Sequence, residues 1–148
     1  MLCKYFLCGV SWRSELYFLI FSRENMRIII VGVHNKVGLK PLCSTTKSGK
    51  LIDRIANRLT KPIEKTNLFN IDYMPIKSEK QKLIDEWFWV NLPAPEDVVV
   101  LLGGAVHKDF NCEINNLIKI QHPAAQWSHK SMDDYVSSAV EKIKKYCN

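Results

Sequence analysis

The stretch Arg27-Ile28-Ile29-Ile30-Val31-Gly32-Val33 decides the fold class of this chain. Its β-branched residues favour a strand. A run of apolar residues without polar alternation is typical of a strand that is covered on both faces, as in a parallel sheet. A second run, Val98 to Leu102, is wholly apolar and is followed by Gly103-Gly104. We therefore expect two buried strands of a parallel sheet, each ending in a glycine turn.

Helical and strand patterns alternate around these two runs. The predicted elements are a helix with Leu51, Ile52, Ile55 and Leu59 on one face, a strand over 65–70, a helix with Leu83, Ile84, Trp87 and Phe88 after a Ser78–Gln81 capping box, a short helix over 105–109, a strand over 117–120 and a final helix capped by Ser131 and Asp134. This alternation predicts an α/β domain in which a small four-stranded parallel sheet lies between helix layers.

The length of 148 residues predicts a single domain. Residues 1–25 read differently from the rest, and Met26 directly precedes the first predicted strand. We therefore expect residues 1–25 to be an N-terminal extension or the product of a misassigned start, and residues 26–148 to form the domain. With 47% hydrophobic and 24% charged residues, the composition is that of a globular protein and excludes disordered and fibrous classes.

The formal net charge of +6 is concentrated in one segment. Between Lys36 and Lys65 there are eight basic and two acidic residues, so this segment alone accounts for the whole excess. Lys50, Arg54 and Arg58 follow one another at helical spacing. Two interpretations remain open, since such a row either binds an anionic partner or simply solvates one helix face.

Five cysteines without a CxxC pair predict neither a disulfide framework nor a metal site, and they favour an intracellular protein with reduced thiols. The longest apolar run, Leu16 to Phe21, has six residues, whereas about 20 are needed to cross a bilayer. We therefore expect no membrane partner, no metal, no cofactor and a monomeric protein.

Ligands of parallel sheets bind beyond the carboxyl ends of the strands. In this chain that rule selects the loop after Gly32, which contains His34 and Asn35, together with Asn67, Gly103 and the segment that contains His122. The loop residues are suited to hold a water or a substrate oxygen. The Asn67 amide can pair with a donor and an acceptor on a flat heterocycle, and the imidazole of His122 can donate to a developing oxyanion. Each residue taken singly is also compatible with an ordinary polar turn.

Four motifs in order resemble the uracil-DNA glycosylase superfamily. Gly32-Val33-His34-Asn35-Lys36-Val37-Gly38 is similar to its first motif, written GINPG or GQDPY, and Lys65-Thr66-Asn67-Leu68-Phe69 to the strand that bears its base-reading Asn. The stretch 98–106 is similar to its third strand and turn, and His122-Pro123-Ala124-Ala125 to its HPSP motif. The resemblance spans residues 26–146 and implies a three-layer α/β/α sandwich.

The resemblance also implies a function, namely hydrolysis of the N-glycosidic bond of uracil or another deaminated base in DNA. Asn67 would read the base, with Gly32 and Gly103 lining the pocket, and His122 would stabilise the departing base. Either His34 or Asn35 would position water. The first-motif proline is absent, and Leu42 or Cys43 would replace the aromatic residue that stacks on the base. The basic row that would bind DNA consists of Lys47, Lys50, Arg54 and Arg58.

Trp127 would be a wedge into the base stack or a loop anchor.

Two other functions remain open. One is a noncatalytic nucleic-acid-binding protein of the same fold, and the other is an enzyme that acts on small nucleosides or nucleotides.

Overall fold

The computed structural model describes residues 26–124 and 131–147 and contains a four-stranded sheet in which every pairing is parallel. The strands lie in the order β2-β1-β3-β4. The described elements are β1 (Ile28–His34), α3 (Lys47–Ala56), β2 (Ile63–Phe69), α4 (Lys77–Asn91), β3 (Val98–Leu102), α5 (Gly103–Asp109), β4 (Asn116–Ile120) and α6 (Met132–Lys144). The predicted α/β fold with a small parallel sheet is confirmed. The expectations for residues 1–25, Ala125 and Trp127 lie outside the described residues.

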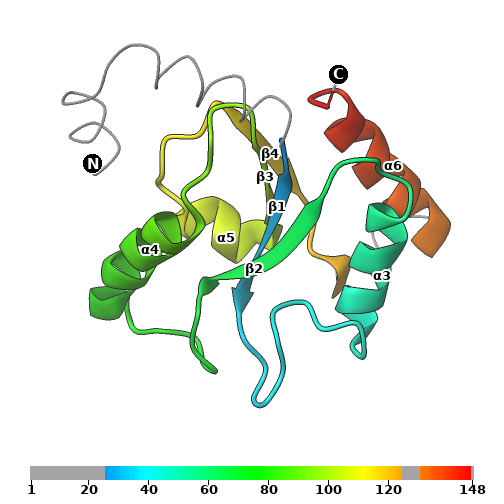
Figure 1. The fold of residues 1–148 in the computed structure, drawn as a ribbon. Helices are drawn as coiled ribbons and strands as arrows, with labels where there is room; N and C mark the ends of the chain where they lie inside the picture. The colour runs from blue at the N-terminus through cyan, green and yellow to red at the C-terminus, as the bar shows by residue number, and fades with distance from the viewer. Residues whose placement is uncertain (1–25, 125–130, 148) are drawn as a thin grey trace, which may run out of the picture.

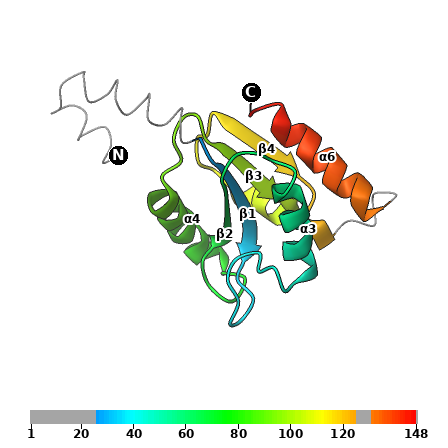
Figure 2. The same ribbon diagram turned by 45° about the vertical axis from the view of Figure 1, so that its right-hand side comes forward.

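Helices cover both faces of the sheet, with α3 and α6 on one face and α4 and α5 on the other (Figures 1 and 2). Side chains alternate along a strand, so Ile28 and Ile30 of β1 pack toward α3 and α6, whereas Ile29 and Val31 pack toward α4 and α5. All five residues of β3 are fully buried. The two apolar runs therefore form the centre of the sheet, because only central strands are covered on both faces along their whole length.

Helix α3 begins where its sequence provides a cap and ends earlier than the hydrophobic pattern predicts. The Thr46 hydroxyl accepts a hydrogen bond from the Gly49 N–H at 3.0 Å. After Ala56 the backbone tightens, because the N–H groups of Arg58 and Leu59 bond three residues back rather than four. Arg58 and Leu59 therefore lie in the turn that follows the helix, and the predicted helical stripe is shorter than expected.

The predicted cap of α4 is wrong, whereas that of α6 is confirmed. Helix α4 begins one residue before Ser78, its N-cap is Ile76, and no side chain caps it. The Ser131 hydroxyl accepts from the Asp134 N–H at 3.1 Å, as predicted. The longest helix within the described ranges, α4, has 15 residues, and no helix there is long and apolar enough to cross a membrane.

A buried ion pair ties the amino ends of β1 and β3 together. Asp97 is 2% exposed and accepts hydrogen bonds from the Arg27 backbone N–H at 3.1 Å, from Arg27 Nε at 2.9 Å and from the Ala94 N–H at 2.8 Å. The same guanidinium donates from Nη1 to Glu64 at the surface. Asp97 therefore satisfies three donors that the hydrophobic strands cannot serve.

Replacing Asp97 with Ala should lower the free energy of unfolding by about 2–4 kcal/mol, because Arg27 Nε and the backbone N–H groups of Arg27 and Ala94 lose their acceptor. The matched control is Glu64→Ala, which removes the exposed partner of the same arginine and should cost less than about 1 kcal/mol. Urea unfolding of both variants measures the difference. Equal losses would contradict the structural role assigned to Asp97.

Candidate active site at the carboxyl edge of the sheet

The connections that leave the carboxyl ends of the two central strands run to opposite faces of the sheet. The chain leaves β1 toward α3 on one face of the sheet and leaves β3 toward α5 on the other (Figure 1). Strands β1 and β3 are neighbours, and ligands of parallel sheets bind where adjacent connections part in this way. The four predicted segments lie at the carboxyl ends of the strands or directly after them: Gly32 and His34 are in β1, Asn67 is in β2, and Gly103 and His122 follow β3 and β4.

The amide of Asn67 lies across the backbone of Gly32. The two residues are paired in register between β2 and β1. A Cβ atom at position 32 would stand only 2.4 Å from Asn67 Oδ1. Asn67 is 6% exposed. Glycine at position 32 is therefore required for space, since any side chain there would displace the amide.

A chain of three asparagine side chains holds this amide in place. Asn67 Nδ2 donates to Asn35 Oδ1 at 2.7 Å, and Asn35 Nδ2 donates to Asn70 Oδ1 at 3.0 Å. The Asn35 N–H also donates to the carbonyl of Ile71 at 2.9 Å, which joins the loops after β1 and β2. No described residue donates a hydrogen bond to Asn67 Oδ1. The amide therefore keeps an acceptor and a second N–H for a ligand.

His34 and Asn35, which the sequence left as alternatives, are placed differently. The His34 ring bonds through Nδ1 to the Asn35 carbonyl at 2.9 Å. A carbonyl only accepts, so Nδ1 carries the proton and the neutral ring keeps its lone pair at Nε2. The Asn35 side chain instead supports Asn67. The structure thus brings Asn35 and Asn67 together, while the contact described for the His34 ring is with the backbone.

His122 follows β4 and packs against the end of β3. A Cβ atom at Gly103 would stand 2.9 Å from His122 Cβ, and Gly103 has a φ of +85°, which favours glycine. The Ala124 N–H donates to His122 Nδ1 at 3.0 Å. An imidazole nitrogen that accepts carries no proton, so the neutral ring holds its proton at Nε2. His122 therefore presents an N–H donor.

The charge state of His122 is set by its surroundings. Burial lowers the pKa of His122, and the positive charge of Lys36 lowers it further. Lys36 belongs to the loop after β1, so the charge of this loop acts on the imidazole that follows β4. At neutral pH the imidazole is an uncharged hydrogen-bond donor.

Asn67 and His122 lie at the same edge of the sheet although they come from its outer strands. The Asn67 amide reaches over Gly32 of β1, and His122 contacts Gly103 at the end of β3. Since β1 and β3 are adjacent, Gly32 and Gly103 lie at the carboxyl ends of neighbouring strands. The structure thus places Asn67 and His122 at the same edge of the sheet.

Leu42 is held beside Gly32 in a strained conformation. Its φ is +49°, which is rare for a bulky residue. Its carbonyl accepts from Lys65 Nζ at 3.1 Å, and Lys65 also pairs with Asp53 of α3. Leu42 Cδ2 lies 3.5 Å from the position of a Cβ at Gly32. Of Leu42 and Cys43, the apolar side chain beside the Asn67 amide is that of Leu42.

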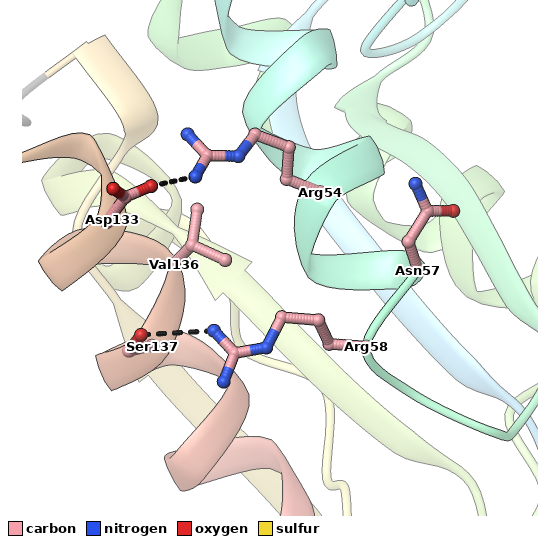
Figure 3. A pocket seen from close by; sticks show the side chains of 6 residues that line it. All are labelled: Arg54, Asn57, Arg58, Asp133, Val136 and Ser137. Carbon is pink, nitrogen blue, oxygen red and sulfur yellow. Dashed lines mark hydrogen bonds and ion pairs between the residues drawn. The ribbon is translucent and has the colours of Figure 1, made fainter.

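The basic residues divide into two groups. Four exposed lysines follow the carboxyl end of β1, and no acidic residue lies among them: Lys36, Lys40, Lys47 and Lys50. Arg54 instead pairs with Asp133, and Arg58 Nη1 donates to Ser137 at 3.0 Å, across a groove of about 400 Å³ between α3 and α6 (Figure 3). Arg58 also borders a pocket with Ile28, the first residue of β1, and so lies toward the amino edge. The two arginines thus have partners on α6, whereas no ion pair with a described residue is seen for the four lysines.

Sequence reasoning missed Asn70, Lys36 as a neighbour of His122, and the anchoring role of Lys65. Asn70 carries a signal, since it is a second amide directly after the strand that bears Asn67. The effect of Lys36 on His122 and the hydrogen bond of Lys65 to Leu42 both depend on the path of the loop after β1, and no local sequence pattern predicts that path.

Comparison with family models, with curated proteins and with solved structures finds no match to this chain. The geometry of the carboxyl edge therefore has to support any functional conclusion by itself.

The variant Gly32→Ala should break the Asn67–Asn35 hydrogen bond, because the added methyl group would come within 2.4 Å of Asn67 Oδ1 and displace the amide. We expect clear shifts of the side-chain amide resonances of both asparagines and a stability loss of about 1–3 kcal/mol. Gly104→Ala is the matched control, since a Cβ there meets nothing within 4 Å. Unchanged Asn67 resonances in Gly32→Ala would refute the close approach.

The variant Lys36→Gln should raise the pKa of His122 while leaving it below the ordinary value, because burial is the larger cause. Lys40→Gln, in the same loop, should leave it unchanged. NMR titration of the ring protons measures both. A depressed folded-state pKa also means that the unfolded chain takes up this proton first as the pH falls below about 6.5, so the free energy of unfolding should decrease there. A His122 pKa that is identical in wild type and Lys36→Gln would contradict the proximity.

Proposed function

We propose that this protein hydrolyses the N-glycosidic bond of uracil or another deaminated base in DNA, on a fold of the uracil-DNA glycosylase type. The observation that supports this most is that one edge of the sheet carries both the buried, oriented amide of Asn67 and the neutral imidazole of His122, which carries its proton at Nε2. An amide with a free donor and acceptor suits the edge of a pyrimidine. An uncharged N–H donor suits an oxygen on which negative charge develops.

In the proposed reaction the target nucleotide is extruded from the strand at a cost of a few kcal/mol, and its base binds at the carboxyl edge of the sheet. Asn67 Oδ1 accepts from the ring N–H of the base, and its second N–H donates to the neighbouring carbonyl. Leu42 packs against the face of the base beside Gly32. The hydrogen bonds through Asn35 and Asn70 hold the Asn67 amide in its orientation, so little of its rotational freedom has to be lost when the base binds.

The bond between the base and the sugar then breaks, and the electron pair leaves with the base. His122 Nε2–H donates to the base oxygen that gains this charge, and a preorganised donor of this kind contributes about 10²- to 10³-fold in rate. We assign the water to His34, whose Nε2 lone pair can accept its proton as oxygen attacks the sugar carbon. In this proposal Asn35 is a positioning residue for Asn67.

The four exposed lysines after β1 support a DNA partner. They are exposed, they follow β1 in the sequence without an acidic residue between them, and they can neutralise phosphates on either side of an extruded nucleotide. Binding through such contacts weakens steeply with salt, with a slope of about 0.9 per phosphate on double-stranded DNA. Lys47 and Lys50 keep the role that the sequence predicts for them, whereas Arg54 and Arg58 have partners on α6.

A single-turnover assay on a uracil-containing oligonucleotide tests the proposal. We expect His122→Ala to slow base release by about 10²- to 10³-fold and Asn67→Ala by about 10- to 10²-fold. The control Asn111→Ala removes an exposed amide that bonds only to Gln81 among the described residues and should leave the rate unchanged. Free base and abasic strand are quantified by mass spectrometry.

Equal residual activity in wild type, His122→Ala and Asn67→Ala would remove the proposed roles. Salt-dependent binding without any base release would instead identify a noncatalytic nucleic-acid-binding protein. Release from free deoxyuridine as fast as from DNA would point to an enzyme for small nucleosides. A second deaminated base, hypoxanthine, is assayed in parallel to determine the base preference.

A further inference from the structure

A pocket of about 190 Å³ lies at the amino edge of the sheet, opposite to the carboxyl edge that carries Asn67 and His122. It is bordered by Ile28 at the start of β1, by the turn after α3 and by the end of α6. Its polar and charged lining consists of Arg58, Thr60, Lys61, Lys144 and Cys147. None of these residues except Arg58 entered the proposed function.

The charges of this pocket are of one sign. Three cationic side chains line it, and no carboxylate is among its lining residues. Neither Lys61 nor Lys144 forms an ion pair with any described residue, and Arg58 uses Nη1 for Ser137, a neutral partner. A concave surface with one sign of charge over apolar walls focuses the field and concentrates counter-ions. Among the residues that the structure describes, none supplies an anion that would balance this pocket.

The three cations come from three segments that the fold brings together. Arg58 follows α3, Lys61 precedes β2, and Lys144 ends α6. Ile28 beneath them is fully buried, so the pocket has an apolar floor that excludes water from one side. The positive charge of Lys61 lowers the pKa of the Cys147 thiol, against the larger effect of burial, which raises it. Lys61 thus acts on the same wall that Cys147 forms.

We propose that this amino-edge pocket binds a phosphate group. A tetrahedral phosphate offers several oxygen atoms, which match ammonium and guanidinium donors that approach from different directions. The Thr60 hydroxyl adds a neutral donor at the rim. This proposal does not depend on the glycosylase function, because it concerns other residues at the opposite edge of the sheet.

Isothermal titration with inorganic phosphate at low ionic strength tests the pocket. A double variant with Lys61→Gln and Lys144→Gln should raise the dissociation constant by at least about tenfold, since each lost charge-assisted hydrogen bond reduces affinity by a comparable factor. The matched control carries Lys142→Gln and Lys145→Gln, which remove two exposed charges at the same end of α6 outside the pocket. The control should bind as wild type does.

The alkylation rate of Cys147 provides a second readout at the pocket itself. Bound phosphate should slow its reaction with the neutral reagent iodoacetamide, because an adjacent anion disfavours the thiolate and blocks the approach. Cys43, which lies in the loop after β1, should react at an unchanged rate. Peptide mapping by mass spectrometry separates the two sites.

The source of the phosphate is distinguished by a second arm with a uracil-free single-stranded oligonucleotide. If the oligonucleotide slows alkylation of Cys147 as inorganic phosphate does, the pocket binds a nucleic-acid backbone. If only inorganic phosphate slows it, the pocket binds a small phosphorylated ligand. The proposal is overturned if wild type shows no phosphate binding, if the control variant loses as much affinity as the pocket variant, or if phosphate leaves Cys147 alkylation unchanged.

Discussion

The requirement that β1 and β3 be covered on both faces governs the rest of this structure. Their apolar side chains alternate between two cores, so a helix layer on one face alone would leave half of them in water. Covering both faces places the connection after β1 and the connection after β3 on opposite sides of the sheet, so the two connections part at its carboxyl edge. The polar residues at the carboxyl edge are therefore gathered by the same burial that makes the fold stable.

The chemistry of the carboxyl edge depends on two glycines at which a polar side chain approaches the backbone closely. Gly32 gives room to the Asn67 amide, and Gly103 gives room to His122. Because neither position carries a side chain, both polar groups can lie directly against the sheet. A strained Leu42 and the Lys65–Asp53 pair then fix the loop that covers Asn67. Such strain is maintained only where surrounding contacts outweigh it, and it is common at functional sites.

The sequence predicts the elements of this fold well because the residues that are buried in each element are apolar and recur at a regular spacing. The strands over 28–34 and 98–102 and the buried face of α6 follow from hydrophobic pattern alone. Helix ends are less predictable: Ser78 looks like a cap yet lies inside α4, and the stripe through Arg58 outlasts α3. For the site, Asn67 and His122 could be selected by their place after strands. The Asn35–Asn70 contacts and the effect of Lys36 on His122 could not, because they depend on how two irregular loops meet.

The positive charge of the chain, which looks continuous in sequence, is divided in space by α3. This helix has ten residues and is therefore about 15 Å long, whereas the screening length at physiological salt is about 8 Å. The lysines after β1 and the cations around Arg58 thus act on anions independently. Arg54, which stands between them, is neutralised by Asp133 of α6, and this interrupts the row further. A single polyanion following the helix would meet this neutralised stretch, whereas two separate ligands, one at each edge of the sheet, would not.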